Sequence, residues 1–240
     1  MIGWRTRLGF LVPPGNPTVE PEMTAMTPHG VSVHYARMSA SGITGSLQGQ
    51  EERNLEQIAS LDQCVSLLAM VQPKVIVLAH TATSYTLGVS GERDLVARME
   101  ATHGCRFITA FGSVIAALAH LGVSRVALGT PYAMSNTLRG KALLEQHGLS
   151  VPNHVSLPGV TNIYDETPER AYQLGRMADH PEAQAVFISG VGMPTLDAIE
   201  AMECDLGKPV ISAASAMMWH ALRTAGVRAT VPGAGRLLRT

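Results

Sequence analysis

The stretch Ala185–Ile199, which reads AVFISGVGMPTLDAI, decides the fold. Its first four residues are apolar or small, and Ser189, Gly190 and Gly192 follow them before a pattern typical of a helix. A short apolar run that ends in small residues and precedes a helix predicts a buried strand and a strand-to-helix turn. Parallel sheets bind ligands at the carboxyl ends of such strands, and glycine lets a ligand approach the backbone N–H groups closely. We therefore expect part of a binding site at Gly190–Gly192.

A second stretch repeats this pattern earlier in the chain. The apolar run Val75–Ala79 leads into the small, polar run His80–Ser84. Each copy is followed by another short strand and an alanine-rich helix, over 107–118 in the first and 209–219 in the second. Such echoes also arise by chance in α/β chains, but here the order of the elements matches as well as their kind. The sequence therefore predicts an internal duplication, with both strand ends in one cleft.

Alternating strands and helices predict an α/β fold with two pseudo-symmetric lobes, each a parallel sheet flanked by helices, and an active site in the cleft between them. We expect the first lobe to comprise residues 1–114 and 216–240, and the second residues 115–215. The glycine-rich tail over 231–238 is expected to pack back on the first lobe. Three helices are expected in particular: a short one at 19–26, a single long one over 51–72, and one over 93–102 after a polar stretch.

Composition excludes several classes of protein. The chain has 240 residues, 46% of them hydrophobic and 15% charged, with a net charge of -1. That is an ordinary globular composition, and no run of Lys or Arg gives the footprint of a nucleic-acid-binding protein. No apolar run reaches the ~18 residues of a membrane span, and the first residues lack a signal-peptide core. We expect no nucleic-acid or membrane partner.

The cysteines show neither a disulfide framework nor metal-ligand spacing. Cys64, Cys105 and Cys204 lie far apart in the sequence. An odd number of scattered cysteines predicts free thiols and a cytoplasmic protein, with no metal site. Patterns for nucleotide, nucleophilic-serine and zinc-peptidase sites (GxGxxG, Walker A, GxSxG and HExxH) are absent, so a nucleotide-binding protein is disfavoured.

Several segments together resemble the aspartate/glutamate racemase superfamily, in the branch of maleate cis-trans isomerase and arylmalonate decarboxylase. The resemblance runs in order through nearly the whole chain. It is carried by VPPGNPT at 12–18, TPY at 130–132, TN at 161–162, GMPTLDAI at 192–199, PVISAA at 209–214 and VPGAGRLL at 231–238. It implies two pseudo-symmetric α/β lobes with the active site between them, which agrees with the predicted duplication.

The resemblance also implies substrate-binding residues. Asn16, Tyr132 and Asn162 would bind the carboxylates of a small-molecule substrate, and their amides and phenol suit that role as hydrogen-bond donors. The N–H groups of Val191 and Gly192, together with the hydroxyls of Thr81 and Thr83, are expected to hold a second carboxylate. A site of this kind also stabilises an enediolate intermediate. The remaining residues expected to bind substrate are Ala82 and Gly190. No cofactor is expected, and a homo-oligomer is.

One feature departs from the family. Its isomerases and racemases use two cysteines, one at each strand end, whereas the decarboxylase uses the second only. The resemblance places Ala82 and Gly190 at these two positions, so the usual thiols are missing. His80 is the imidazole next to a strand end, and alternation along a persisting strand would put it on the same face as Ala82. We expect His80 and Tyr132 as catalytic groups; His80 as a core histidine remains open, and Ser84, Tyr85 and Ser189 are weaker candidates.

Two functions stay open from the sequence. The first is a cofactor-independent isomerase or decarboxylase that acts on a small dicarboxylate through an oxyanion-stabilised intermediate; addition or loss of water fits the same site. The second is a non-catalytic or regulatory carboxylate-binding protein that kept the cleft. Asp197, which opens a helix, is expected to be a cap and not a catalytic group.

Overall fold

The structure is a computed structural model that describes residues 2–240, and these residues form two parallel sheets of four strands each. The first sheet has the order β2-β1-β3-β4 and the second has the order β6-β5-β7-β8. The strands are β1 (Thr6–Val12), β2 (Val31–Arg37), β3 (Val75–Leu78), β4 (Arg106–Thr109), β5 (Val126–Thr130), β6 (His154–Ser156), β7 (Ala185–Ile188) and β8 (Val210–Ser212). The predicted α/β fold with two flanked parallel sheets is confirmed.

Helices follow almost every strand. The helices are α1 (Val19–Ala25), α2 (Gln50–Ala59), α3 (Leu61–Ala69), α4 (Thr81–His103), α5 (Ala110–His120), α6 (Met134–Gln146), α7 (Pro168–Ala178), α8 (Leu196–Leu206) and α9 (Ala213–Thr224), with short 3-10 turns η1 (Ile163–Asp165) and η2 (Leu237–Arg239). None of the helices in the described part of the chain combines the length and apolar character needed to cross a membrane.

The two halves repeat details as well as strand order. Glu100 accepts a hydrogen bond from the Phe107 N–H, seven residues later, and Glu203 does the same for Val210, also seven residues later. The helix that follows each last strand is capped in the same way. Thr109 at the start of α5 and Ser212 at the start of α9 each accept a hydrogen bond from the N–H three residues later. These repeated hydrogen bonds are what the predicted internal duplication implies, and the duplication itself stays a prediction.

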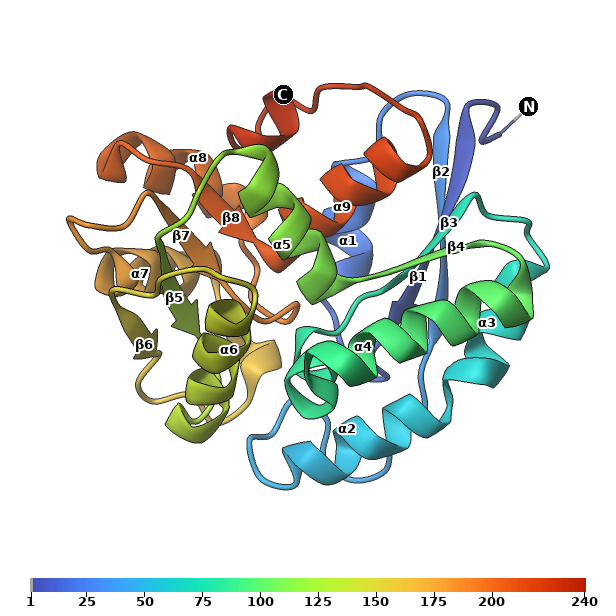
Figure 1. Ribbon diagram of the computed structural model, residues 1–240, viewed down its shortest axis with the longest axis horizontal. Helices are drawn as coiled ribbons and strands as arrows, with labels where there is room; N and C mark the ends of the chain where they lie inside the picture. Colours follow the sequence, from blue (N-terminus) through green and yellow to red (C-terminus); the bar gives the residue numbers. More distant parts are fainter. Residues whose placement is uncertain (1) are drawn as a thin grey trace.

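A shared core joins the halves. One face of each sheet contributes to the same hydrophobic cluster, for example Phe10 of β1 and Leu128 of β5, together with α5 and α9. Figure 1 shows α5 and α9 next to each other between the two sheets, and these helices pack against each other. The outer faces have separate clusters, one under α3 and α4 and one under α7 and α8. The alternation of side chains along each strand thus divides the apolar residues between a central core and two outer ones.

Two expectations about helices are wrong. The helix predicted over 51–72 is two helices that meet at Ser60, whose hydroxyl donates to the Gln57 carbonyl at 2.8 Å. Such side-chain bonds compete with regular helix geometry. The helix predicted over 93–102 begins at Thr81, because β3 ends at Leu78, and it bends at Gly88, whose φ of 68° suits glycine alone.

The C-terminal tail makes its polar contacts with helices of the shared core and of the second sheet. The N–H of Gly233 and the guanidinium of Arg239 reach Glu200 on α8, and the N–H of Arg236 reaches Glu203. Helix α9 itself packs on α1, β3 and β4 of the first half. The proposed lobe boundaries, with residues 216–240 completing the first lobe, stay a prediction.

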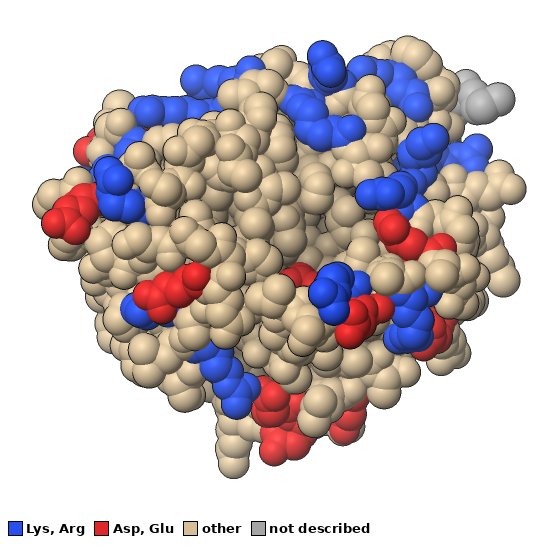
Figure 2. Space-filling model, in the orientation of Figure 1, with Lys and Arg blue, Asp and Glu red and all other residues tan. Residues whose placement is uncertain are grey.

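Figure 2 shows Lys and Arg side chains mainly along the upper edge of one face, and the middle of that face largely free of charged groups.

Candidate active site

The candidate site lies where the carboxyl ends of four inner strands meet. The loops that follow β1, β3, β5 and β7 supply Asn16, Thr81, Tyr132 and Gly190 respectively. Three of these side chains are almost fully buried, with 1% of Asn16, 0% of Thr81 and 2% of Tyr132 exposed. The site is therefore an enclosed cluster of polar groups.

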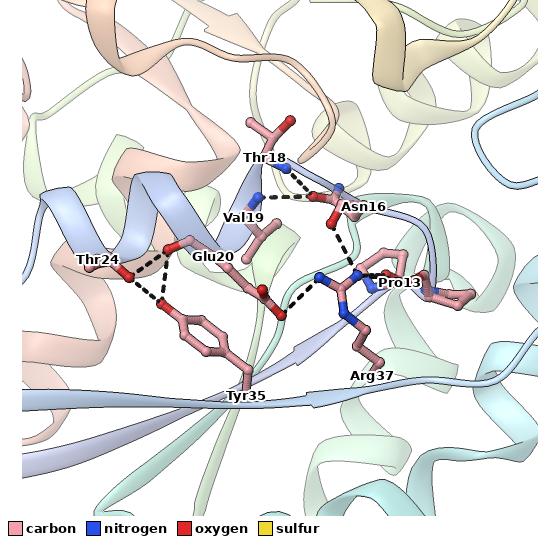
Figure 3. A network of polar contacts seen from close by, with 9 residues as sticks. Pro13, Asn16, Thr18, Val19, Glu20, Thr24, Tyr35 and Arg37 are labelled. Carbon is pink, nitrogen blue, oxygen red and sulfur yellow. Dashed lines mark hydrogen bonds and ion pairs between the residues drawn. The ribbon is translucent and has the colours of Figure 1, made fainter.

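Asn16 is held by the backbone on both sides. Its Oδ1 accepts hydrogen bonds from the N–H groups of Thr18 at 2.8 Å and Val19 at 2.9 Å, which caps the start of α1 (Figure 3). Its Nδ2 donates to the Val191 carbonyl at 3.1 Å. Arg37 of β2 fixes the same loop from outside through the carbonyls of residues 13, 14 and 16 and through an ion pair with Glu20 at 3.0 Å. The amide is therefore fixed precisely, and it already joins the two halves.

The start of α4 supplies backbone donors. The first N–H groups of a helix have no partner within it, so those of Thr81, Ala82 and Thr83 are free to bind an anion. The expected role of the two threonine hydroxyls is less direct, because each already has a partner. Thr81 Oγ1 pairs with the Tyr132 hydroxyl at 3.2 Å, and Thr83 Oγ1 pairs with His80 Nδ1 at 2.8 Å.

Tyr132 lies between the two strand ends. Besides its contact with Thr81, its hydroxyl is 3.3 Å from the place that a Cβ at Gly190 would take. Burial raises the pKa of Tyr132 to about 12, and the hydrogen bonds from Thr81 and Ser189 oppose this shift. The phenol is thus protonated at neutral pH and able to donate a hydrogen bond or a proton to an anion.

The turn after β7 exposes backbone to the site. Gly190 has a φ of 100°, which L-residues with a side chain rarely adopt, and the Met193 N–H closes the turn on the Gly190 carbonyl at 3.0 Å. The carbonyls of Val191 and Gly192 accept from Asn16 and Thr18. In a trans peptide the N–H points away from the carbonyl, so the Gly192 N–H points away from Asn16. Within residues 2–240 neither the Val191 nor the Gly192 N–H has a hydrogen-bond partner.

His80 is buried, as the alternative of a core histidine implies. It is the extended residue just before α4 and is 8% exposed. Because the strand ends at Leu78 and Ala82 is helical, the expected alternation of His80 and Ala82 on one strand face is wrong. Burial lowers the pKa of His80 to about 4, so the imidazole is neutral near pH 7. The role of His80 as an acid or base remains a prediction, and its pKa is well below that of an ordinary imidazole.

Asn162 turns its amide toward a different segment. Its Oδ1 accepts from the Tyr164 N–H at 2.9 Å, and its Nδ2 donates to the Thr44 carbonyl at 3.3 Å. The Ile163 N–H adds a bond to the Gly45 carbonyl at 2.9 Å. Asn162 therefore anchors the loop over 39–49 in this closed arrangement, whereas Asn16, Tyr132 and the turn at 190–192 come together.

Two tyrosines complete the cluster. Tyr85 of α4 pairs with Ser189 Oγ at 2.7 Å and stacks edge-on against Tyr132. Tyr164 lies against Gly192, where an added Cβ would be 2.9 Å from its ring, and Asn16 is within its hydrogen-bonding reach. Burial raises the pKa of both tyrosines above the usual range. Sequence reasoning missed Tyr164, although its position two residues after Asn162 in a loop of the second half was the available signal.

The cysteines lie elsewhere in the structure. Cys64 is buried in the outer core under α3, with its Sγ 3.4 Å from the Arg37 carbonyl. Cys105 precedes β4, at the amino end of that strand, and Cys204 is exposed on α8. None of these three cysteines follows the carboxyl end of β1, β3, β5 or β7, the strands whose ends form the site.

Asp197 is not the cap of α8. Thr195 precedes the helix without a capping side-chain bond of its own, and the carboxylate of Glu22 from α1 binds its first N–H groups instead. Glu22, in the first turn of α1, is thus buried between the halves and 7% exposed.

Comparisons with known proteins agree with this architecture. The family model described as arylmalonate decarboxylase matches residues 8–238. A maleate isomerase of Nocardia farcinica is 33% identical over 250 residues, which cover 97% of this chain and 95% of the relative. An arylmalonate decarboxylase of Bordetella bronchiseptica is 32% identical over 174 residues, 68% of this chain and 70% of that one.

A solved structure extends the likeness to the whole fold. It is a mutant of the Nocardia farcinica maleate cis-trans isomerase with a covalently bound succinylcysteine intermediate. It matches with a TM-score of 0.88 and 30% identity over 98% of each chain. With two parallel sheets, a polar site at their carboxyl ends and a family model that spans nearly all of its length, the chain belongs to the arylmalonate decarboxylase family.

Proposed function

We propose that this protein is a cofactor-independent isomerase or decarboxylase of small dicarboxylates, and that decarboxylation is its reaction. The observation that carries the proposal is the position of the Tyr132 hydroxyl, 3.2 Å from Thr81 Oγ1 and 3.3 Å from the place of a Cβ at Gly190. One proton donor thus reaches both strand ends. Membership of the family supports isomerisation or decarboxylation of a small dicarboxylate, and the residues at the strand ends favour decarboxylation.

The donors suit a malonate-type substrate. One carboxylate would bind the first N–H groups of α4 and the other the turn at 190–192. When the bond from Cα to one carboxylate breaks, CO₂ leaves and the electron pair passes into the remaining carboxylate as an enediolate. Tyr132 then donates its proton to Cα, and the phenolate recovers a proton from water. A pKa of about 12 keeps Tyr132 in the protonated form that this step needs.

The strand ends disfavour isomerisation by covalent addition. The related maleate isomerase mutant carries a succinylcysteine, in which a thiol has added to the substrate. Residues 82 and 190 are Ala and Gly in this chain, and a buried phenol with a raised pKa is a weak nucleophile. Decarboxylation needs a proton donor and an oxyanion site but no nucleophile. The partner is accordingly a small carboxylate, and the assembly into a homo-oligomer is proposed without a specified interface.

A carboxylate-binding protein without turnover is the second candidate. The observation that favours it is that the polar side chains satisfy one another: Asn16 bonds the Val191 carbonyl, Tyr132 pairs with Thr81 and Tyr85 with Ser189. A site closed in this way holds a ligand only after these pairs exchange partners.

An NMR assay in D₂O distinguishes the candidates. Malonates with different substituents, maleate, aspartate and hydantoins are incubated with the protein, and spectra record CO₂ loss, isomerisation and exchange at Cα. Decarboxylation predicts a monocarboxylate with one deuterium at Cα, a product that the Tyr132→Phe variant forms far more slowly. Tyr172→Phe is the matched control, because Tyr172 pairs with Asp205 on the surface. Saturable binding without any product supports the binding protein instead.

A further inference from the structure

A carboxylate outside the reacting cluster is buried between the halves. Glu22 Oε1 accepts hydrogen bonds from the N–H groups of Thr195 at 2.6 Å and Leu196 at 2.7 Å, and the Thr195 hydroxyl is 3.4 Å away. The second carboxylate oxygen, Oε2, is buried and has no partner within residues 2–240. A buried carboxylate with one unpartnered oxygen costs stability, so its retention calls for a role beyond packing.

Glu22 is the last of three contacts along one line. Asn16 bonds the Val191 carbonyl at 3.1 Å, and Thr18 bonds the Gly192 carbonyl at 3.1 Å. Glu22 continues the series at Thr195 and Leu196. Residues 16–22 of the first half therefore bind residues 191–196 of the second half at both ends of the segment, and this segment contains the turn whose Val191 and Gly192 N–H groups have no partner within residues 2–240.

The start of α8 depends on these contacts. Its preceding residue, Thr195, makes no capping bond with its own side chain. The first N–H groups of a helix need acceptors, and Glu22 supplies one from another helix. Because α8 starts only four residues after Gly192, the direction in which this helix begins sets the course of the turn.

We propose that Glu22 is a positioning residue that holds the turn at 190–192 in the orientation in which its Val191 and Gly192 N–H groups bind substrate carboxylate. The proposal rests on the proposed function for the identity of the ligand. The positioning itself concerns the free protein and is measured without a substrate.

The titration of Glu22 gives a direct probe of the contact. Burial raises the pKa of Glu22 to about 7, the backbone bonds from Leu196 and Thr195 oppose this, and the charge of Asp197 adds to it. Asp197, in the first turn of α8, is the other charged group that lines the adjoining cavity of about 300 Å³. Protonation near neutral pH removes most of the acceptor strength at the start of α8, so nearby amide resonances respond.

The experiment combines amide NMR with binding of a dicarboxylate, for which malonate is the probe. The variants are Glu22→Gln, which keeps the acceptor and loses the charge, and Glu22→Ala, which loses both. Glu203→Ala is the matched control. Glu203 is also a buried glutamate at α8, but it binds the N–H groups of Val210 and Arg236, away from the turn.

In the parent, the amide resonances of Thr195, Leu196, Val191 and Gly192 should shift together with a midpoint near pH 7, and in Glu22→Gln this titration should vanish. Glu22→Ala should move the Val191 and Gly192 resonances and weaken malonate binding by about tenfold, the worth of a helix cap. Glu22→Gln should restore most of that affinity. Glu203→Ala should lower the melting temperature and leave both readouts unchanged.

Unmoved Val191 and Gly192 resonances in folded Glu22→Ala would overturn the proposal, as would malonate affinity equal to that of the parent. If the parent binds no dicarboxylate at all, the proposed function fails, whereas the amide titration still decides whether Glu22 positions the turn.

Discussion

The hydroxyl of Tyr132 lies 3.2 Å from the hydroxyl of Thr81, although Thr81 follows β3 of the first sheet and Tyr132 follows β5 of the second. Thr81 is the first residue of α4, and the Tyr132 hydroxyl is also 3.3 Å from the place that a Cβ at Gly190 would take. In the proposed function, this contact places the proton donor Tyr132 between the two groups of backbone N–H donors that would bind the carboxylates. The predictions below test that arrangement.

Replacing Tyr132 with Phe removes the hydroxyl and keeps the ring in the core. We expect turnover to fall by roughly 10²–10⁴-fold, the usual range for losing a general acid, and dicarboxylate affinity to fall by about 1–3 kcal/mol. NMR spectra recorded at set times measure turnover, and calorimetry measures the affinity. Tyr172→Phe should leave both unchanged; equal losses in the two variants would point to a general effect of the purification or fold.

Replacing Asn16 with Ala removes the donor that joins the halves through Val191 and the acceptor that binds the N–H groups of Thr18 and Val19. Its three bonds are buried, so unfolding should become easier by about 2–4 kcal/mol, and ligand binding should weaken by about 1–3 kcal/mol. Asn16→Asp retains the acceptor toward Thr18 and Val19 but places a carboxylate against the Val191 carbonyl. It should therefore bind dicarboxylate at least as poorly as Asn16→Ala does. Calorimetry measures the affinities, and chemical denaturation of the same samples measures the stabilities.

Burial of His80 makes the folded protein acid-sensitive. Its pKa falls from about 6.5 to about 4, so the unfolded chain binds the proton first as pH falls. Stability should decrease between pH 6.5 and 4 by roughly 3 kcal/mol from this group, and His80→Gln should reduce that slope. Exposed His29→Gln is the control. If His80 acts in catalysis, the pH–rate limb lies near 4; a limb near 6.5 that disappears in His80→Gln would contradict the buried, neutral imidazole.

Glu22 has the opposite effect on stability. Its pKa is raised from 4.5 to about 7, so the folded protein holds the proton longer than the unfolded chain. Its contribution to the free energy of unfolding is complete below pH 4.5. As pH rises from 4.5 to 7, this contribution falls by roughly 3 kcal/mol. Glu22→Gln should remove this loss, which denaturation at pH 5 and pH 8 detects. A parent and variant with parallel pH–stability curves would show that Glu22 is ionised throughout.

Thiol modification should leave the proposed activity intact. Cys204 is exposed and should react first with iodoacetamide, whereas Cys64 is buried and burial raises the pKa of Cys105. None of these positions adjoins Tyr132 or the turn at 190–192. Mass spectrometry locates the adduct while the NMR assay follows turnover. Loss of activity that tracks modification at Cys204, and that Cys204→Ser prevents, would assign that thiol a role we do not expect.

The sequence by itself determined the duplicated α/β architecture. Short apolar strands closed by small residues have one stable solution, a buried parallel sheet, and their order along 75–118 and 185–219 gave both halves. The same pattern located the strand ends at Thr81 and Gly190, because the carboxyl ends of parallel strands meet at one edge, whereas Asn16 and Tyr132 came from the resemblance to a known family.

Only the tertiary structure decided which groups in those loops are free to act. Local pattern does not encode burial by a distant segment, and burial is what neutralises His80 and keeps Tyr132 protonated. It likewise does not encode partners more than a hundred residues away, such as Val191 for Asn16 or Leu196 for Glu22. Hydrogen bonds and pKa values depend on the groups brought together in space, so they are fixed when the two halves pack and not before.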